Sequence, residues 1–550
     1  RRRSLRMKLD LLITNARIIT MDPDRPQARS MGVWHGLVVG FDEEIPTDHA
    51  ARELDLDGAT VVPGFIDAHC HTAWFGQTLL GLDCSAAASW PEVYDLVRER
   101  AQAVAPGEWI LGAGLTPSAL TGHRDLSSLD DAAGDRPLYL RHTSGHALTT
   151  NSEGLRRAGY FDGTFEAPGG GGIPTDDAGR PTGLVEENAQ ECIQNLVKPY
   201  PEDLIVRGLD LATRRYASEG ITSFTDAGIG LGWIGHSPAE FSAYQAAADS
   251  GRLHARAQVM PVMDTLHALP EPGELNASVT GPRLGLDLGI RTGVGDDRLS
   301  IGPVKIFSDG SLLGETSAMH DALCGGSHSR GEFLIPPDRL IDVAEQAYRA
   351  GWSLAIHAIG DRAVDIAMDT IEHCQEHHGP GPTPNRIEHV GVTNPDQVAR
   401  LSELGVAVTP QAAFIGSLGQ HMSSLVGTEK TEWLYRGQSF VDAGVCVAGS
   451  SDRPVADGRP LLGIQRAVDR TTDEGFIIGP GERMTPYDAL KTYTVNAAEA
   501  TGFGDSRGTL APGYCADFVV LESNPLESAS IEEIGILQTF VGGEATYRRA

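Results

Sequence analysis

Two histidines, His69 and His71, stand two residues apart in the apolar, β-rich run VVPGFIDAHCH. Because alternate side chains of a strand point to the same face, both imidazoles would face one side and Cys70 the other. Three more ligand-type residues lie near the ends of other β-rich runs: His357, His389 and Asp452. Any one of these histidines alone would more simply be a hydrogen-bonded core residue. Five such groups at strand ends instead favour a metal site.

Lys305 lies inside another such run, VKIFSDGS. Burying an ammonium group is costly, so this lysine should pair with a carboxylate such as Asp309, become neutral, or be chemically converted. A neutral amine that reacts with carbon dioxide becomes a carbamate, whose carboxylate on a long arm can bridge two cations. We favour this carboxylated lysine over the ion pair, and Lys305 then joins the five residues above as a metal ligand.

Eight β-rich runs carry or precede these residues, and helical stretches alternate with them. The runs cover 61–71, 221–228, 255–262, 304–311, 354–360, 386–392, 406–413 and 445–452. This alternation predicts a parallel α/β architecture, and eight units predict a (β/α)8 TIM-like barrel whose C-terminal strand ends meet at one mouth. We expect the barrel to span 63–498.

Two parts of the chain do not fit a barrel of eight regularly spaced strand–helix units. About 150 residues separate the first two runs, and we expect a large insertion at 75–205 that forms a lid or substrate wall. Short β-rich runs at 7–62 and 499–549 cannot each bury enough surface alone. They are therefore predicted to pair as one composite β-sandwich domain made from both termini.

Composition excludes some classes of partner. The chain has 550 residues and a formal net charge of −30, which argues against nucleic acid and membrane partners. With 41% hydrophobic and 21% charged residues, it has the composition of a packed globular protein. Seven scattered cysteines and no visible export or membrane segment predict a cytoplasmic location.

One motif indicates a different function. The run GLGWIG at 230–235 fits the G-x-G-x-x-G pattern of dinucleotide-binding turns, so an NAD-dependent oxidoreductase is a distant alternative. Trp233 crowds this turn, and no acidic residue stands ~20 residues later, where a ribose partner is expected. A non-catalytic scaffold is the other distant alternative, but a protein released from metal binding has no reason to keep several ligands that are costly to bury.

Several motifs together point to a known family. They are VVPGFIDAHCHTA, VKIFSDGSLLGETSA, LAIHAIGDRAV, RIEHVGV, VAGSSDRPV, TVNAAEATG and GTLAPGYCADFVVLE, with RHTSGHALTTNS and GRPTGLVEENA in the insertion. Over nearly the whole chain they resemble the amidohydrolase superfamily, and the insertion motifs resemble its family 3 branch, which includes N-substituted formamide deformylases. The resemblance implies a barrel with a composite β-sandwich and a metal-dependent hydrolase that acts on carbon–nitrogen bonds other than peptide bonds.

The resemblance also assigns roles to individual residues. It places the metal ligands at His69, His71, Lys305, His357, His389 and Asp452. It implies one or two divalent ions per chain, most simply zinc, a small-molecule substrate and a homodimer or larger oligomer. His146 is the better match to a family histidine that faces the active site, with His142 as the alternative.

The expected reaction is cleavage of an amide, or of an N-formyl or N-acyl amine, by a metal-activated water. Asp452 would take the proton and return it to the leaving nitrogen, while His146 would steady the developing oxyanion. Deaminases and ester or lactone hydrolases use similar sites, so they are the nearer alternatives.

Overall fold

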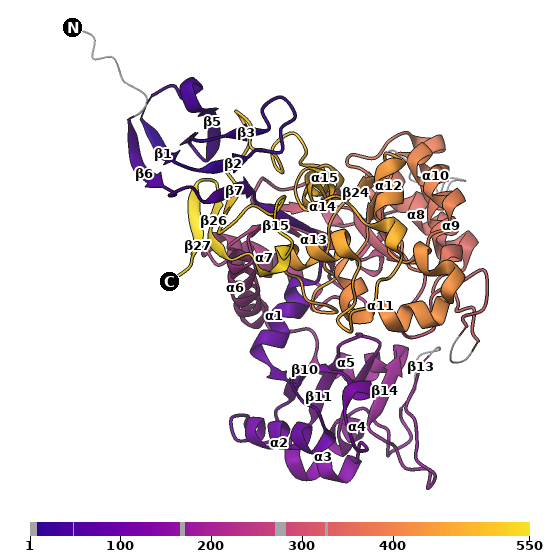
Figure 1. The fold of residues 1–550 in the computed structure, drawn as a ribbon. Coiled ribbons are helices and arrows are strands. Elements are labelled where there is room, and N and C mark those ends of the chain that lie inside the picture. Colours follow the sequence, from indigo (N-terminus) through magenta and orange to yellow (C-terminus); the bar gives the residue numbers. More distant parts are fainter. Residues whose placement is uncertain (1–7, 48, 166–170, 270–281, 325–327) are drawn as a thin grey trace. The chain divides into compact units, whose positions relative to one another are not determined.

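The computed structural model describes residues 8–47, 49–165, 171–269, 282–324 and 328–550 (Figure 1). The chain divides into two compact units. Unit 1 comprises 1–71, 213–228 and 253–550, and unit 2 comprises 72–212 and 229–252. No helix among the described residues is long and apolar enough to cross a membrane.

Parallel strands run through unit 1 in two sheets. One has the order β19-β16-β15-β8, with β8 at Phe65–Cys70, β15 at Ile221–Ile229, β16 at Arg256–Pro261 and β19 at Leu299–Ile301. The other has the order β20-β21-β22-β23-β24, at Val304–Phe307, Leu354–Ala358, Arg386–His389, Ala407–Thr409 and Cys446–Val447. Each of the eight runs that the sequence indicates contains one of these strands, and β19 is additional.

Backbone contacts join the ends of these two sheets. A parallel bridge links Val262, just after β16, to Lys305 in β20. Two hydrogen bonds join β8 to the segment after β24. The amide of Ala68 donates to the carbonyl of Gly449 at 3.1 Å, and the amide of Asp452 donates to the carbonyl of His69 at 2.8 Å. Both contacts place the segment after β24 beside β8.

The parallel strands are buried because helices follow them along the chain. Every residue of β8, β15, β16, β21 and β22 is buried, as expected for a parallel sheet that is covered on both faces. The helices of this region are α8 Pro337–Arg349, α9 Asp361–His378, α10 Pro395–Leu404, α11 Ala413–Val426, α12 Gln438–Asp442, α13 Pro460–Asp469, α14 Pro486–Thr492 and α15 Val495–Ala500. A capping box between Asn394 and Gln397 fixes the start of α10.

The first β-rich run, 61–71, is not one strand. Its first part is β7, Thr60–Pro63, which pairs with a C-terminal strand, and its second part is β8. Gly64 separates the two, and a Cβ there would lie 2.1 Å from Oγ1 of Thr222. The close approach of Thr222 therefore requires glycine at the point where the chain passes from one sheet to the other.

Both chain ends enter one sheet (Figure 1, indigo and yellow). Its order is β27-β26-β25-β7-β2-β3, with β2 Arg17–Ile19, β3 Gln27–Ala28, β25 Phe518–Leu521, β26 Ile536–Val541 and β27 Glu544–Arg548. A second sheet, β5-β4-β1-β6, consists of Leu37–Phe41, Met31–Trp34, Leu9–Thr14 and Ala50–Asp55. One apolar core joins the two sheets and includes the stacked rings of Phe518 and Phe540. A separate hairpin pairs β17, His267–Leu269, with β18, Arg283–Gly285.

Unit 2 has its own sheet, with the order β13-β14-β12-β11-β10-β9. The strands are Gly171–Gly172, Leu184–Glu187, Ala147–Thr149, Leu138–His142, Ile110–Leu115 and Leu82–Asp83. The helices are α1 Thr72–Leu80, α2 Trp90–Ala101, α3 Leu126–Ala133, α4 Ser152–Arg157, α5 Glu191–Val197 and α7 Glu240–Asp249, while α6, Glu202–Ser218, runs from unit 2 into unit 1. Apolar residues of α2 and α3 form a core with β10 and β11 that is independent of unit 1.

Candidate metal centre

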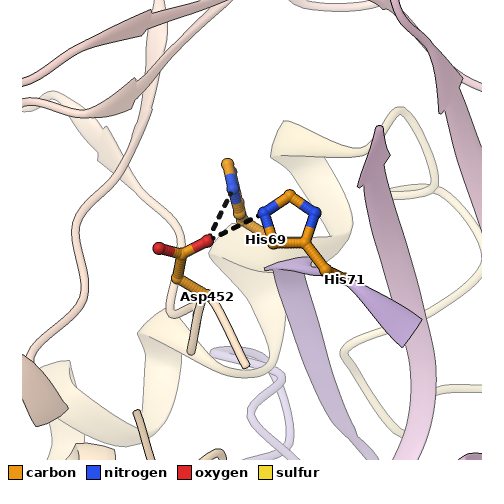
Figure 2. A group of neighbouring side chains, drawn as sticks. All are labelled: His69, His71 and Asp452. Carbon is orange, nitrogen blue, oxygen red and sulfur yellow. Dashed lines mark ion pairs between the residues drawn. The ribbon is translucent and has the colours of Figure 1, made fainter. Parts of the chain in front are cut away.

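Three ligand-type side chains of unit 1 converge at the end of β8 (Figure 2). Nε2 of His69 and Nε2 of His71 lie 3.3 and 3.0 Å from the same oxygen, Oδ1 of Asp452. One ligand atom from each residue lies within 4.8 Å of the others, and all three residues are buried. Asp452 adopts φ +55°, a left-handed conformation that aspartate and asparagine tolerate better than most residues. Its carboxylate contacts the two imidazoles, and among the described residues it accepts no backbone N–H as a helix cap would.

Two further histidines extend this group. The ring centroid of His389, at the end of β22, lies 4.8 Å from that of His69, and His357 in β21 lies 4.5 Å from His389. Both side chains are buried. Unit 1 therefore brings the four histidines that the sequence indicates into one continuous cluster with Asp452.

Hydrogen bonds from neighbouring residues fix the imidazoles of His69 and His389. Nδ1 of His69 donates to the carboxylate of Glu388. Nδ1 of His389 donates to Oε1 of Gln411 at 2.8 Å, and the Gln411 amide nitrogen donates elsewhere. In both rings, Nε2 is left as the nitrogen with a free electron pair, which is the usual arrangement of metal-binding histidines.

His357 is oriented through its other nitrogen. Its Nε2 donates to the carbonyl of Gly310 at 3.1 Å and lies 3.4 Å from Oδ1 of Asp309. Nδ1 is buried and has no hydrogen-bond partner among the described residues. A buried acceptor nitrogen of this kind matches what a cation requires.

Glu388 and Gln411 contact two of the cluster's histidines, and the sequence did not predict either contact. Glu388 accepts two hydrogen bonds from Arg386, at 2.7 and 2.8 Å, and one from Thr409. The period of two in RIEHV places Arg386 and Glu388 on one face of β22, and that spacing could have drawn attention to the pair. Nothing in the sequence near Gln411 indicates its contact with His389.

Lys305 is buried in β20, with 1% of its surface exposed. Its ammonium nitrogen has no hydrogen-bond partner among the described residues. Burial lowers the pKa of Lys305 to about 8, and the charges of Glu388 and Asp452 partly oppose that shift. The anticipated alternative, an ion pair with Asp309, is absent, because Asp309 accepts hydrogen bonds from the amides of Ile359, Gly360 and Ala318.

The electrostatics of the cluster favour neutral imidazoles and ionised carboxylates. Burial lowers the pKa of His71 to about 4 and the pKa of His389 well below its usual range. Burial alone would raise the pKa of Asp452, but its contacts with the imidazoles of His69 and His71 hold it well below its usual value. Deprotonated imidazole and carboxylate are the forms that bind a metal. The donor set and the orphaned nitrogens thus fit a divalent cation.

His146 lies in unit 2, where its Nδ1 is 3.1 Å from Oε2 of Glu187. The alternative, His142, is buried, its Nε2 lies 2.9 Å from the hydroxyl of Thr149, and burial lowers its pKa to about 3. The role of His146 in stabilising an oxyanion stays a prediction.

The glycine-rich run at 230–235 is not arranged to hold a phosphate. Glu240 accepts hydrogen bonds from the amides of Gly230 and His236, at 2.9 and 2.8 Å. The carbonyls of Trp233 and Gly235 accept from Lys198. A carboxylate thus occupies the backbone donors at both ends of the turn, where a dinucleotide-binding turn would offer its amides to a pyrophosphate.

Comparison with known proteins identifies the class. Residues 52–547 match the amidohydrolase family, so the chain belongs to that family. It is 28% identical to a putative amidohydrolase, YtcJ, of Bacillus subtilis, over 91% of each chain, and 29% identical to the N-substituted formamide deformylase of Arthrobacter pascens, over 98% of each. Its fold is similar to that of an uncharacterised metal-dependent hydrolase from Pyrococcus horikoshii, with a TM-score of 0.73 and 22% identity over 95% of this chain and 99% of that one. The family resemblance indicated by the sequence motifs is therefore confirmed.

Proposed function

We propose that the protein is a divalent-metal-dependent hydrolase that cleaves the carbon–nitrogen bond of a small-molecule amide, or of an N-formyl or N-acyl amine. The observation that carries the proposal is the convergence of His69, His71 and Asp452, extended by His389 and His357. Imidazole and carboxylate donors of this kind suit zinc, although other divalent ions accept the same ligands.

The proposed ligands are His69, His71, Lys305, His357, His389 and Asp452. A divalent cation, when bound, lowers the pKa of water towards ~7 and polarises a substrate carbonyl. The residues around the cluster prepare it for such an ion, because Glu388 and Gln411 orient two imidazoles before any ligand arrives.

Lys305 is proposed to be carboxylated. With a pKa of about 8, roughly a tenth of its side chain is neutral at pH 7. The free electron pair of Nζ forms a bond to the carbon of carbon dioxide, one N–H proton leaves to water, and the product carries one negative charge on its oxygens. The change replaces a buried cation that has no hydrogen-bond partner with a group that can bind metal.

Asp452 is proposed as the proton carrier. Its Oδ1 faces His69 and His71, and this leaves Oδ2 as the oxygen that can accept a proton from the attacking water and deliver it to the leaving nitrogen. Its low pKa keeps the carboxylate ionised at neutral pH.

We also propose that the eight parallel strands indicated by the sequence close into a (β/α)8 barrel, and that 75–205 is an insertion that helps to shape the substrate site. The bridge between Val262 and Lys305 and the hydrogen bonds between β8 and the segment after β24 support closure. The preference for amides over other substrates rests on the deformylase relative, which is similar along the full length of both chains.

The decisive experiment combines metal analysis with a substrate screen. Purified protein should contain at least one divalent ion per chain, and a chelator should remove both metal and activity. The screen should compare N-formyl and N-acyl amines with esters, lactones and aminopurines. Activity that persists without metal would contradict the mechanism, and hydrolysis of esters or deamination alone would contradict the proposed bond.

Lys305→Ala tests the carbamate separately. This variant should lose most activity and recover part of it when a short carboxylic acid is supplied, because the acid replaces the missing carboxylate. A Lys305→Ala variant with normal metal content and normal rate would show that the lysine is not a ligand.

A further inference from the structure

Unit 2 contains a cavity of about 200 Å³, and none of its lining residues is a proposed metal ligand. It lies among α1, β10, β11 and the first part of α6. Its lining residues include three aromatic residues and three arginines: Trp74, Trp109, Tyr139, Arg100, Arg141 and Arg207. Among the described residues that line it there is no aspartate or glutamate, although the chain as a whole carries a net charge of −30. The cavity is therefore locally positive in an acidic protein.

Arg141, in β11, is the most informative residue of this cavity. Only 4% of its surface is exposed, and its guanidinium carbon lies 3.8 Å from the ring centroid of Trp74. The two nitrogens Nε and Nη2 are buried and have no hydrogen-bond partner among the described residues. Stacking occupies the face of a guanidinium and leaves its N–H edge free.

The free edge of Arg141 has a specific geometry. The N–H bonds of Nε and Nη2 point in the same direction along one side of the guanidinium, and that side matches the two oxygens of a carboxylate. Nε2 of Gln77, on the same cavity wall, also lacks a hydrogen-bond partner among the described residues. Three N–H groups are therefore available to one anion.

Other charged groups nearby do not neutralise Arg141. Glu240 is engaged by His236, whose Nδ1 lies 2.9 Å from its Oε1, and by two backbone amides. Lys198 supplies no negative charge either; burial and the charge of Arg141 lower its pKa to about 7, so about half of it is protonated at neutral pH. Burying an unpaired cation is costly unless something compensates it.

We propose that this cavity binds a small organic anion that carries a carboxylate on a flat apolar group. The carboxylate accepts hydrogen bonds from Nε and Nη2 of Arg141 and from Nε2 of Gln77. The flat group packs against the aromatic side chains of the wall. A cavity of about 200 Å³ is somewhat larger than an engineered cavity of ~150 Å³ that holds benzene, so a ligand of about the size of benzoate fits. The proposal does not depend on the reaction at the metal centre.

Benzoate and benzamide provide a matched pair of probes, because they share shape and differ in charge. Calorimetry on the full-length protein should detect benzoate binding, with at least tenfold weaker binding of benzamide and of acetate. Arg141→Met should weaken benzoate binding by about 10- to 100-fold, the range expected for a lost charge-assisted pair. The control Arg156→Met changes an exposed arginine of the same unit and should leave binding unchanged.

Two further measurements keep the test decisive. Gln77→Leu should weaken benzoate binding less than Arg141→Met does, which provides a second readout if the arginine variant fails to fold. His71→Ala should leave benzoate binding intact, because its side chain belongs to the metal centre. No benzoate binding at millimolar concentration, equal binding of benzamide, or loss of binding only in His71→Ala would each overturn the proposal.

Discussion

Arg386 and Arg141 are both buried arginines on β-strands, yet their surroundings differ. Arg386 donates to both oxygens of Glu388 and to the carbonyl of Ala68, so its charge is compensated inside the protein. Arg141 stacks on Trp74 and keeps two N–H groups unpaired. The difference separates a guanidinium that orients other side chains from one that is available to a ligand. It also suggests opposite ligands, a cation beside Glu388 and an anion beside Arg141.

The largest expected effect is the loss of catalytic rate on replacing Asp452, which belongs to the metal centre and not to the cavity of unit 2. Asp452→Asn keeps the size, one coordinating oxygen and a residue that tolerates φ +55°, but removes the basic oxygen. Metal content should largely persist while kcat falls by ~10²- to 10⁴-fold. The measurement is elemental analysis together with kinetics on the substrate found by screening. A variant that keeps both its metal and a near wild-type rate would show that the proton travels through another group.

Removing Arg386 from its buried ion pair with Glu388 should destabilise the protein strongly. Arg386→Met leaves the carboxylate of Glu388 buried without its main counter-charge, and the free energy of unfolding should fall by about 3–5 kcal/mol. Urea denaturation measures this change. Arg339→Met, on the exposed side of α8, is the control and should change stability by less than about 0.5 kcal/mol. If both substitutions changed the free energy of unfolding equally, the buried ion pair would contribute no more to stability than an exposed one.

A smaller effect is expected where a side chain only orients a ligand. Gln411→Leu removes the acceptor for Nδ1–H of His389, so metal affinity should fall by about 10- to 100-fold. Competition against a chromogenic chelator measures the affinity. Gln420→Leu, an exposed position on α11, serves as the control and should not change it. Unchanged affinity in Gln411→Leu would exclude His389 from the ligand set.

The smallest effect should come from Arg141. Replacing an uncompensated buried cation with methionine removes its desolvation cost, so stability should stay unchanged or rise by up to about 2 kcal/mol. Urea denaturation alongside Arg386→Met gives the direct contrast between the two arginines. A loss of several kcal/mol in Arg141→Met would show that the guanidinium already has a stabilising partner within the fold.

Much of the fold and of the site follows from local sequence patterns. Short apolar runs that alternate with helical stretches indicate where the parallel strands lie, and the spacing of His69 and His71 sets them on one face of β8. The extra strand β19 and the split of the run 61–71 were not anticipated. The split depends on Thr222 lying against Gly64, and a contact between residues so far apart in sequence leaves no local signal.

The sequence alone determined which chemistry was available, because imidazoles, a carboxylate and a lysine at strand ends are the ligand types that a divalent metal binds. Only the tertiary structure decided how each group is used. Glu388 contacts His69 across more than 300 positions of the chain, and Asp309 turns to backbone amides and not to Lys305. In the same way, the unpaired edge of Arg141 exists because folding buries it beside Trp74 and brings no carboxylate to it. Such pairings depend on which distant strands become neighbours, and local periodicity carries no information about that.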